Sequence, residues 1–477
     1  MATSSTLPSN ADNIIVGAGT AGLVAGPNAT DDPRIQEPAA YTSLAGSELD
    51  WNLRTVSHQA GLNNRELDHP AYKVVGVSSA INGSAFLPPS PAGINAWAEL
   101  GIPNGPGTAH QSASVPPATG PIQAWNEALE THGYSHNGDF LAEQTRIGAR
   151  AYTAATDPRS GHRSSADGAG QYYGHLIGRD NVTIMTGATV QRIILQAAPN
   201  ETGDNVAATA RPRSSPSMPS HEVILAAGAF NSSKSLDLGI TTTIDLPGVG
   251  ENMQNHIIAG FPVTLKPNAA IAELTPGIKA LAFARADLSE SDEDDDDGGD
   301  ARSAAIQTLL QNHNEASAIY ALAILPNNLA LLAIGLPCPF STGDTHATST
   351  TTADPPRINP RFITDNRDIH LLTHHTRHLA SIINTSPALR PFFQEAQIPS
   401  EKEALETLLR GSIATAAHHT CGTAAMVPRE AGGVVGENLK AYGTVNVRVV
   451  DASVFPLVPS VNPLMLLLNG LIRGGGW

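Results

Sequence analysis

The chain has 477 residues, 41% of them hydrophobic, which is enough to bury a sizeable core and to form more than one lobe. Its 28 basic and 44 acidic side chains give a net charge of −16, and no basic patch with interleaved aromatic residues occurs, so we expect no nucleic-acid partner. Cys338 and Cys421 are the two cysteines, too few for a disulfide scaffold, and neither has metal-ligand residues beside it.

The N-terminus carries neither the charged region nor the apolar region of a secretory signal. The apolar run Leu464 to Leu468, like every other apolar run in the chain, is far shorter than the roughly 20 residues that cross a bilayer as a helix. We therefore expect a cytoplasmic protein with no membrane partner.

Residues 290–300 read ESDEDDDDGGD and contain eight acidic side chains, so half of the net charge comes from one run. A solvated, disordered insertion is the expected structure of such a run. The alternative is a metal site, but no glycine-spaced calcium loop frames these carboxylates.

A short apolar strand, Asn13–Val16, leads into the glycine pattern GAGTAG at residues 17–22. In such a pattern the first glycine makes a tight turn, the second lets the backbone approach a pyrophosphate, and the third lets helix and strand pack closely. The following helix N-terminus would offer free N–H groups to phosphate. The position after a strand favours dinucleotide binding over a plain glycine-rich turn. The candidate cofactor contacts here are Gly17, Gly19, Thr20, Ala21 and Gly22.

The residues that follow depart from a dinucleotide-binding fold. Gly26-Pro27 would end the helix after about one turn, and residues 28–33 read as a loop. Glu37 lies at a tolerable distance for the acid that holds a ribose, but no apolar strand leads to it. We expect the second strand of the fold to be missing from this region.

Four later segments have clear local patterns. Residues 122–129 have helical periodicity, 179–190 read as a strand pair, 221–229 read as a buried strand ending in small residues, and 368–385 read as a helix. Residues 72–86 contain a small polar run that, taken alone, reads as a turn before a buried strand.

The C-terminal 60 residues carry the strongest functional pattern. His418 and His419 lie in a loop of small residues, Val447–Val450 is an apolar strand that ends in Asp451, and Asn462 precedes an apolar segment. Ligands of open α/β sheets gather at the carboxyl ends of strands, so Asp451 stands where a ligand contact is expected.

The order of these elements resembles a known family. His419 is followed by Gly422-Thr423 and Met426, then by GGVV, YG and RVVDAS, and finally by Asn462-Pro463. Together with DLPGVGENMQNH at residues 245–256, this series resembles the glucose–methanol–choline family of flavin oxidoreductases.

The resemblance implies an α/β fold: a discontinuous Rossmann-like FAD-binding domain with a smaller α+β substrate-binding domain built on an antiparallel sheet. Residues 1–257 would form the first part of the FAD domain, 258–417 the substrate-binding domain, and 418–477 a catalytic segment that returns to the FAD domain.

The resemblance also implies site residues. His419 matches the family's catalytic base, although a shift of one residue would select His418 instead. Asn462 matches the second active-site position, although it could simply cap the apolar segment that follows it. The further cofactor contacts that the resemblance implies are Ser78, Asn82, Val190, Asp451 and Ala452.

The implied reaction is oxidation of the CH–OH group of a small-molecule alcohol, with hydride transfer to FAD and reoxidation by oxygen or another electron acceptor. One alternative is a catalytically impaired relative that binds FAD poorly, since the ribose strand is missing and Val77 replaces a glycine of the family's loop. Another is a non-redox member of cyclase or lyase type, because a fold does not determine a reaction.

Overall fold

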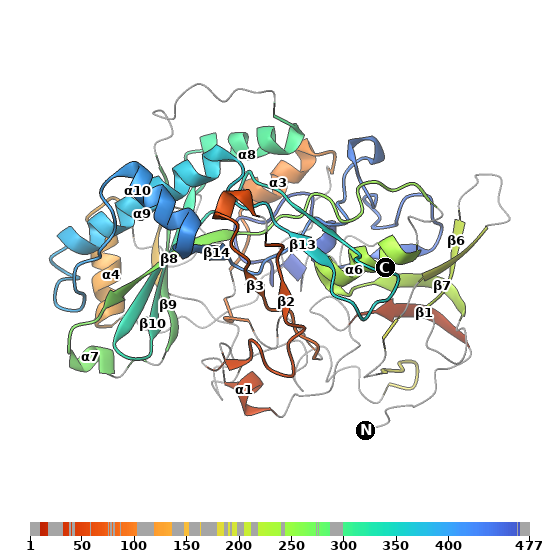
Figure 1. Ribbon diagram of the computed structural model, residues 1–477, viewed down its shortest axis with the longest axis horizontal. Helices are drawn as coiled ribbons and strands as arrows, with labels where there is room; N and C mark the ends of the chain where they lie inside the picture. Colours follow the sequence, from red (N-terminus) through yellow and green to blue (C-terminus); the bar gives the residue numbers. More distant parts are fainter. Residues whose placement is uncertain are drawn as a thin grey trace.

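The fold is that of a computed structural model of the whole chain. The structure describes residues 10–17, 32–37, 40, 43–57, 59–74, 76, 79, 82–85, 87–102, 119–135, 147–151, 163, 179–185, 189–190, 193–197, 205–210, 218–239, 244–272, 274, 276–286, 299–464 and 466–467. Within them, two sheets lie toward opposite ends of the long axis of the molecule (Figure 1).

The larger sheet has six described strands, and every neighbouring pair in it is antiparallel. Its strands alternate buried and half-buried positions, most clearly in β11, as expected for a sheet with one face against a core. In spatial order the strands are β14 (Ala414–Ala416), β8 (Ile257–Thr264), β11 (Leu329–Gly335), β10 (Ala318–Leu325), β9 (Gly277–Ala284) and β4 (Gly148–Ala151).

Helix α9 packs against β10 and β11, and α4 packs against β4 and β9 (Figure 1). Three helices begin at side-chain caps, because a carboxylate or hydroxyl oxygen accepts a free N–H of the first turn. The helices on this side are α3 (Pro91–Glu99), α4 (Pro121–Glu130), α7 (Ala269–Ala272), α8 (Ala301–Gln311), α9 (Asn366–Thr385) and α10 (Lys402–Leu408), the last continuing into the π-helical turn η4 (Leu409–Ile413).

The smaller sheet brings together three segments that are far apart in the sequence. Strand β7 (Met218–Leu225) lies between β1 (Asn10–Val16) and β15 (Val447–Val449), and both pairings are parallel. Helix α6 (Gly228–Gly239) follows β7 almost directly. Because the strands are parallel, their carboxyl ends meet at one edge, where a ligand of an α/β sheet is expected.

Short elements make up the rest of the described secondary structure. Three two-stranded pairings occur among the described residues, and Asp344 in one of them is buried and paired with Arg357 and Arg361. These elements are β2 (Leu53–Arg54) with β3 (Asp68–His69), β5 (Ile193–Ala197) with β6 (Asn205–Ala210), β12 (Asp344–His346) with β13 (Arg357–Asn359), helix α1 (Pro33–Gln36), and the 3-10 turns η2 (Ala60–Leu62), η5 (Arg429–Ala431) and η6 (Ala452–Val454).

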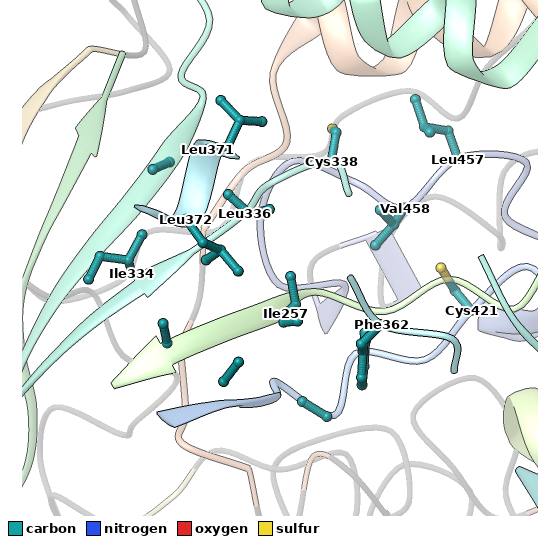
Figure 2. Packing of buried hydrophobic residues seen from close by; sticks show 14 of the residues in the cluster. Ile257, Ile334, Leu336, Cys338, Phe362, Leu371, Leu372, Cys421, Leu457 and Val458 are labelled. Atoms are coloured by element: carbon teal, nitrogen blue, oxygen red, sulfur yellow. The ribbon is translucent and has the colours of Figure 1, made fainter. Parts of the chain in front are cut away.

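One hydrophobic cluster extends beneath both the larger sheet and the C-terminal loops. Figure 2 shows Ile257 at the start of β8 and Leu372 of α9 in the same packed region as Cys421 and Val458. These four side chains are buried. The loops that carry the C-terminal motifs are therefore anchored in the core rather than resting on its surface.

Both cysteines are free and buried. Burial raises the pKa of the Cys338 thiol to about 12, so it stays protonated and unreactive at neutral pH. No cluster of three or more His, Cys, Asp or Glu side chains suited to a metal ion occurs in the described part of the chain.

The structure confirms the predicted fold class, with its antiparallel sheet and its parallel sheet, and it confirms the helices expected near 122–129 and 368–385. The prediction of a strand pair at 179–190 is wrong. The described residues 179–185 and 189–190 form no strand, and the nearest strand, β5, begins at Ile193.

The region after the glycine pattern is only partly described. Residues 18–31, where the second strand is expected to be missing, lie outside the described residues, and Asp32–Glu37 contain α1. Most of the acidic run also lies outside, although Asp300 is described and caps α8. In the described residues, we find no helix with the length and hydropathy needed to cross a membrane.

The burial pattern of β11 predicts a difference between two neighbouring leucines. Leu332 is fully buried, whereas Leu331 is half-buried on the opposite face. Leu332→Ala should lower the free energy of unfolding by about 2–5 kcal/mol, because a cavity remains. Leu331→Ala should cost less. Urea denaturation measures both, and equal losses would contradict the assigned faces.

Candidate functional site

The segment Gln254–His256, just before β8, connects the two C-terminal loops that carry the predicted site. The N–H of Gln254 donates to the carbonyl of Cys421 over 3.0 Å, and the N–H of Cys421 donates back over 2.9 Å. The Gln254 side chain donates to the carbonyl of Pro456 and accepts from the N–H of Val458. The histidine loop and the loop before Asn462 are thus held against the same three residues.

Asn255 fixes the backbone of the histidine loop. Its Oδ1 accepts from the N–H of His419 over 2.8 Å, and its Nδ2 donates to Thr420 Oγ1 over 3.0 Å. The same Nδ2 lies 3.2 Å from Nε2 of the buried His69, which therefore accepts. Both ends of the Asn255 amide are used to hold this loop in place.

His419 lies with its ring perpendicular to that of His256, and the two Nδ1 atoms are 2.8 Å apart. Burial is the main cause that holds the pKa of His419 well below the ordinary histidine value, and the neighbouring His256 and His418 lower it further. His419 is therefore a neutral imidazole at neutral pH, the form that can accept a proton.

His418 points elsewhere and has a strained backbone. Its φ of +61° lies in the left-handed region, which few residues other than glycine adopt. The side chain is exposed, and its ring makes an edge contact with His69 at a centroid distance of 5.0 Å. Of the two consecutive histidines, it is His419 that the structure binds to His256.

Asn462 lies at the end of the second loop. Its Nδ2 donates to the carbonyl of Ala85, while its Oδ1 is buried and has no hydrogen-bond partner among the described residues. A buried oxygen without a donor costs about 1–3 kcal/mol. No capping bond from Asn462 to the following helical turn is found in the described residues, so the capping alternative gains no support there.

The loop around Ala85 is fixed by Arg163. Its buried guanidinium donates to Asn82 Oδ1 over 2.9 Å, to Ser84 Oγ over 2.8 Å and to the carbonyl of Ile35 over 3.0 Å. Asn82 Oδ1 also accepts the N–H of Ser84. The oxygen of Asn82 is therefore used within the loop, and a cofactor contact of this side chain would fall to its Nδ2.

Asp451 lies at the carboxyl end of β15, as predicted, and it caps α6. Its Oδ2 accepts from the N–H of Gly228 over 2.9 Å and from Ser232 Oγ over 2.5 Å. Its Oδ1 accepts from the N–H and the hydroxyl of Ser453. A carboxylate at a helix N-terminus is stabilised by the helix dipole. Since both oxygens are occupied, the predicted cofactor contact of Asp451 and Ala452 would fall to their backbone.

Gly17 ends β1 at the same edge of the sheet. Its φ is +133°, and a Cβ placed there would lie 2.1 Å from the carbonyl oxygen of Ala226. Only glycine fits, as predicted for the first glycine of the pattern. Val190 is half-buried against the main core. The other candidates, Gly19, Thr20, Ala21, Gly22 and Ser78, lie outside the described residues.

Reasoning from sequence missed the residues that hold the site together. The string DLPGVGENMQNH contains Gln254, Asn255 and His256, but in the sequence it indicated only a family resemblance and no role for these three residues. A polar Gln-Asn-His run directly before the apolar strand β8 was the available signal. His69 gave no signal in the sequence.

Two sequence models of one family match this chain, both described as GMC oxidoreductase, over residues 11–258 and 339–468. The chain belongs to the GMC oxidoreductase family. The cofactor of this family is FAD, and the smaller parallel sheet is the core of its Rossmann-like FAD-binding domain.

Similarity to individual family members extends over almost the full length. A GMC oxidoreductase family protein, Mala s 12 of Malassezia sympodialis, is 28% identical, with 94% of this chain and 89% of that protein covered. An alcohol dehydrogenase [acceptor] of Pseudomonas putida is 26% identical over 93% of this chain and 91% of that protein. A solved FAD-dependent oxidoreductase from Chaetomium thermophilum has the same fold, with a TM-score of 0.80 at 22% identity and 98% coverage of both chains.

The described residues fit FAD at two places. Gly17 follows β1 at the carboxyl edge of the parallel sheet, where ligands of α/β folds bind, and the space that its Cβ would take is filled by the backbone of Ala226. Asn462 presents a buried oxygen that has no donor among the described residues, as expected of a group that faces a ligand.

The clash at Gly17 predicts loss of the cofactor. Gly17→Ala should displace β1 from Ala226 and so reduce the FAD that stays bound through gel filtration, measured by absorbance. Gly133→Ala is the control, because Gly133 also has a positive φ (+87°) but no atom within 4 Å of the added Cβ. Gly133→Ala should keep its FAD. Equal retention in both variants would contradict the role of Gly17.

The buried histidines predict acid sensitivity. Burial lowers the pKa of His69 to about 3 and that of His256 to about 4, whereas an unfolded histidine titrates near about 6.5. The unfolded chain therefore binds more protons below that pH, so stability falls as the pH drops from about 6.5 toward 4. Each histidine contributes up to about 1.4 kcal/mol per pH unit.

Urea denaturation between pH 7.5 and 5 measures this slope. His69→Gln should make the slope shallower, and replacement of the exposed His313 by Gln should leave it unchanged. A slope that His69→Gln does not alter would contradict the assignment.

Proposed function

We propose that this GMC family member oxidises the CH–OH group of a small-molecule alcohol to a carbonyl, with His419 as the base and Asn462 as the hydrogen-bond partner of the reacting oxygen. Oxygen or another acceptor would complete the cycle. Membership of a family of FAD-dependent oxidoreductases supports the redox chemistry, and a similar protein is named an alcohol dehydrogenase.

The observation that carries this proposal is the state of His419. Its backbone is held by Asn255 and its ring by His256, and its pKa is lowered by burial. A base that is neutral and fixed in orientation before the substrate arrives loses little free energy to reorganisation. Such a base can remove the hydroxyl proton of an alcohol.

Asn462 supports the same chemistry from the second loop. Its Oδ1 is buried and lacks a donor within the described residues, which leaves this end of the amide for a bound ligand. The Nδ2 group has two hydrogens and uses one on the carbonyl of Ala85. The other is available to the substrate oxygen once negative charge develops there.

Oxidation of the alcohol removes one proton and one hydride from it. The hydroxyl proton passes to His419, the carbon–oxygen single bond becomes a carbonyl, and the hydride leaves the carbon. Bound FAD supplies the two-electron acceptor for that hydride. The protein residues thus bind the alcohol, orient it and remove its proton.

An impaired relative is the second candidate, and one observation favours it. Asp32–Glu37, the segment that ends in the candidate ribose acid, forms the helix α1 rather than a strand, whereas residues 18–31 lie outside the described residues. A folded protein that stays colourless after addition of FAD would support this candidate over the oxidoreductase.

Two matched substitutions test the base. His419→Asn should keep FAD but lower the rate of flavin reduction by about 10²–10⁴-fold, because a general base of this kind contributes that much. His418→Asn should keep the wild-type rate, since asparagine tolerates a left-handed backbone. The measurement is flavin bleaching under anaerobic conditions with a panel of primary alcohols. An unchanged rate in His419→Asn, or an equal loss in His418→Asn, would defeat the assignment.

A further inference from the structure

His256 lies between two backbone carbonyls and the ring of His419. Its Nε2 is 3.0 Å from the carbonyl oxygen of Pro337 and 2.9 Å from that of Pro459. A carbonyl oxygen can only accept a hydrogen bond, so Nε2 of His256 must carry the hydrogen. This nitrogen is buried between two acceptors, and no other protonation of Nε2 satisfies them.

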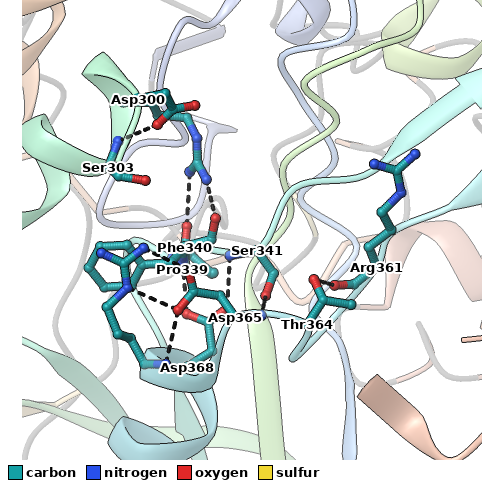
Figure 3. Close-up of polar contacts among 11 residues, drawn as sticks. Asp300, Ser303, Pro339, Phe340, Ser341, Arg361, Thr364, Asp365 and Asp368 are labelled. Atoms are coloured by element: carbon teal, nitrogen blue, oxygen red, sulfur yellow. Dashed lines mark hydrogen bonds and ion pairs between the residues drawn. The ribbon is translucent and has the colours of Figure 1, made fainter. Parts of the chain in front are cut away.

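The carbonyl of Pro337 is held in place by the chain that follows it. Arg302 donates to the carbonyls of Pro339 and Phe340, and the buried carboxylate of Asp368 accepts from the N–H groups of Phe340 and Ser341 over 2.8 and 2.9 Å (Figure 3). Arg302 thus binds the carbonyl groups of residues 339–340, and Asp368 binds the N–H groups of residues 340–341. The acceptor of His256 therefore lies two residues before a segment that these hydrogen bonds hold in place.

The carbonyl of Pro459 is fixed from the other loop. The N–H of Val458, one residue earlier, donates to Gln254 Oε1 over 2.9 Å. Pro459 also lies three residues before Asn462. The Nε2 atom of His256 thus contacts two segments that flank the proposed site.

The protonation of His256 determines that of His419. Burial lowers the pKa of His256 to about 4, so the ring is neutral at neutral pH and its Nδ1 carries a lone pair. The Nδ1 of His419 lies 2.8 Å away and must donate. A neutral His419 with its hydrogen on Nδ1 has its lone pair on Nε2.

We propose that His256 is a positioning residue that fixes the tautomer of His419, so that Nε2 of His419 is the nitrogen that accepts the substrate proton. The tautomer follows from the hydrogen bonds alone, while its catalytic use rests on the proposed function. The opposite tautomer would bring two lone pairs together at 2.8 Å. When His419 gains a proton, its Nδ1–H keeps the same acceptor, and the imidazolium stays hydrogen-bonded.

The first test reads the tautomer directly. In FAD-loaded protein labelled with ¹⁵N-histidine, His419 should show a protonated Nδ1 and an unprotonated Nε2, and His256 the reverse. Spectra of His419→Asn and His256→Asn assign the signals by their loss. An unprotonated Nδ1 on His419 would overturn the proposal. This measurement does not depend on catalytic activity.

The second test uses two amides that each replace one ring nitrogen. In His256→Asn, Oδ1 takes the place of Nδ1 and can still accept from His419. In His256→Gln, Nε2 takes the place of the ring Nε2 and can still donate to the carbonyls, but the acceptor for His419 is lost. Asparagine should therefore retain most of the rate of flavin reduction. Glutamine should lose about 10²-fold or more in that rate, the lower range of what a general base contributes.

The two variants also separate this proposal from the proposed function. Both must retain FAD and the near-UV circular dichroism of the wild type, and equal rates in the two would contradict the tautomer role. If the wild-type protein reduces no flavin with any alcohol, the proposed function fails, yet the ¹⁵N spectra still decide the tautomer. If alcohols are oxidised but the ¹⁵N pattern is reversed, only the role of His256 fails.

Discussion

The hydrogen bonds of Gln254, Asn255 and His256 are the constraint on which the proposed site depends. Main-chain and side-chain groups of these residues hold the histidine loop and the loop before Asn462 at once. The segment leads directly into β8, which pairs with β11 and β14 in the larger sheet. The positions of the two loops that carry His419 and Asn462 thus depend on a segment that continues into the larger sheet.

A second constraint operates at the edge of the parallel sheet. Asp451 joins the end of β15 to the N-terminus of α6, and Gly17 lets β1 approach Ala226 at van der Waals distance. Each contact joins segments separated by more than two hundred residues. Buried carboxylate bonds and the absence of one Cβ therefore shape this edge, and a ligand would meet backbone there rather than a free carboxylate.

Local patterns predicted much of this fold. Runs of apolar residues predicted the strands near Asn13–Val16 and Val447–Val450, and helical periodicity predicted the helix near 368–385. The strand pair at 179–190 failed, since β propensity does not determine pairing, which depends on a neighbour elsewhere in the chain. The pairing of His256 with His419 could not be predicted for a related reason: it joins residues 163 positions apart, and no local rule specifies such a contact.

The order in which the parallel sheet is built has a consequence for biosynthesis. β1 is among the first segments to leave the ribosome and β15 among the last, and β7 lies between them in space. The edge shared by Gly17 and Asp451 is therefore complete only after nearly the whole chain has been translated. A ligand that binds at this edge must therefore bind late, when nearly the whole chain has been made. A chain truncated before Val447 would expose one side of β7 as an unpaired strand, a typical starting point for aggregation.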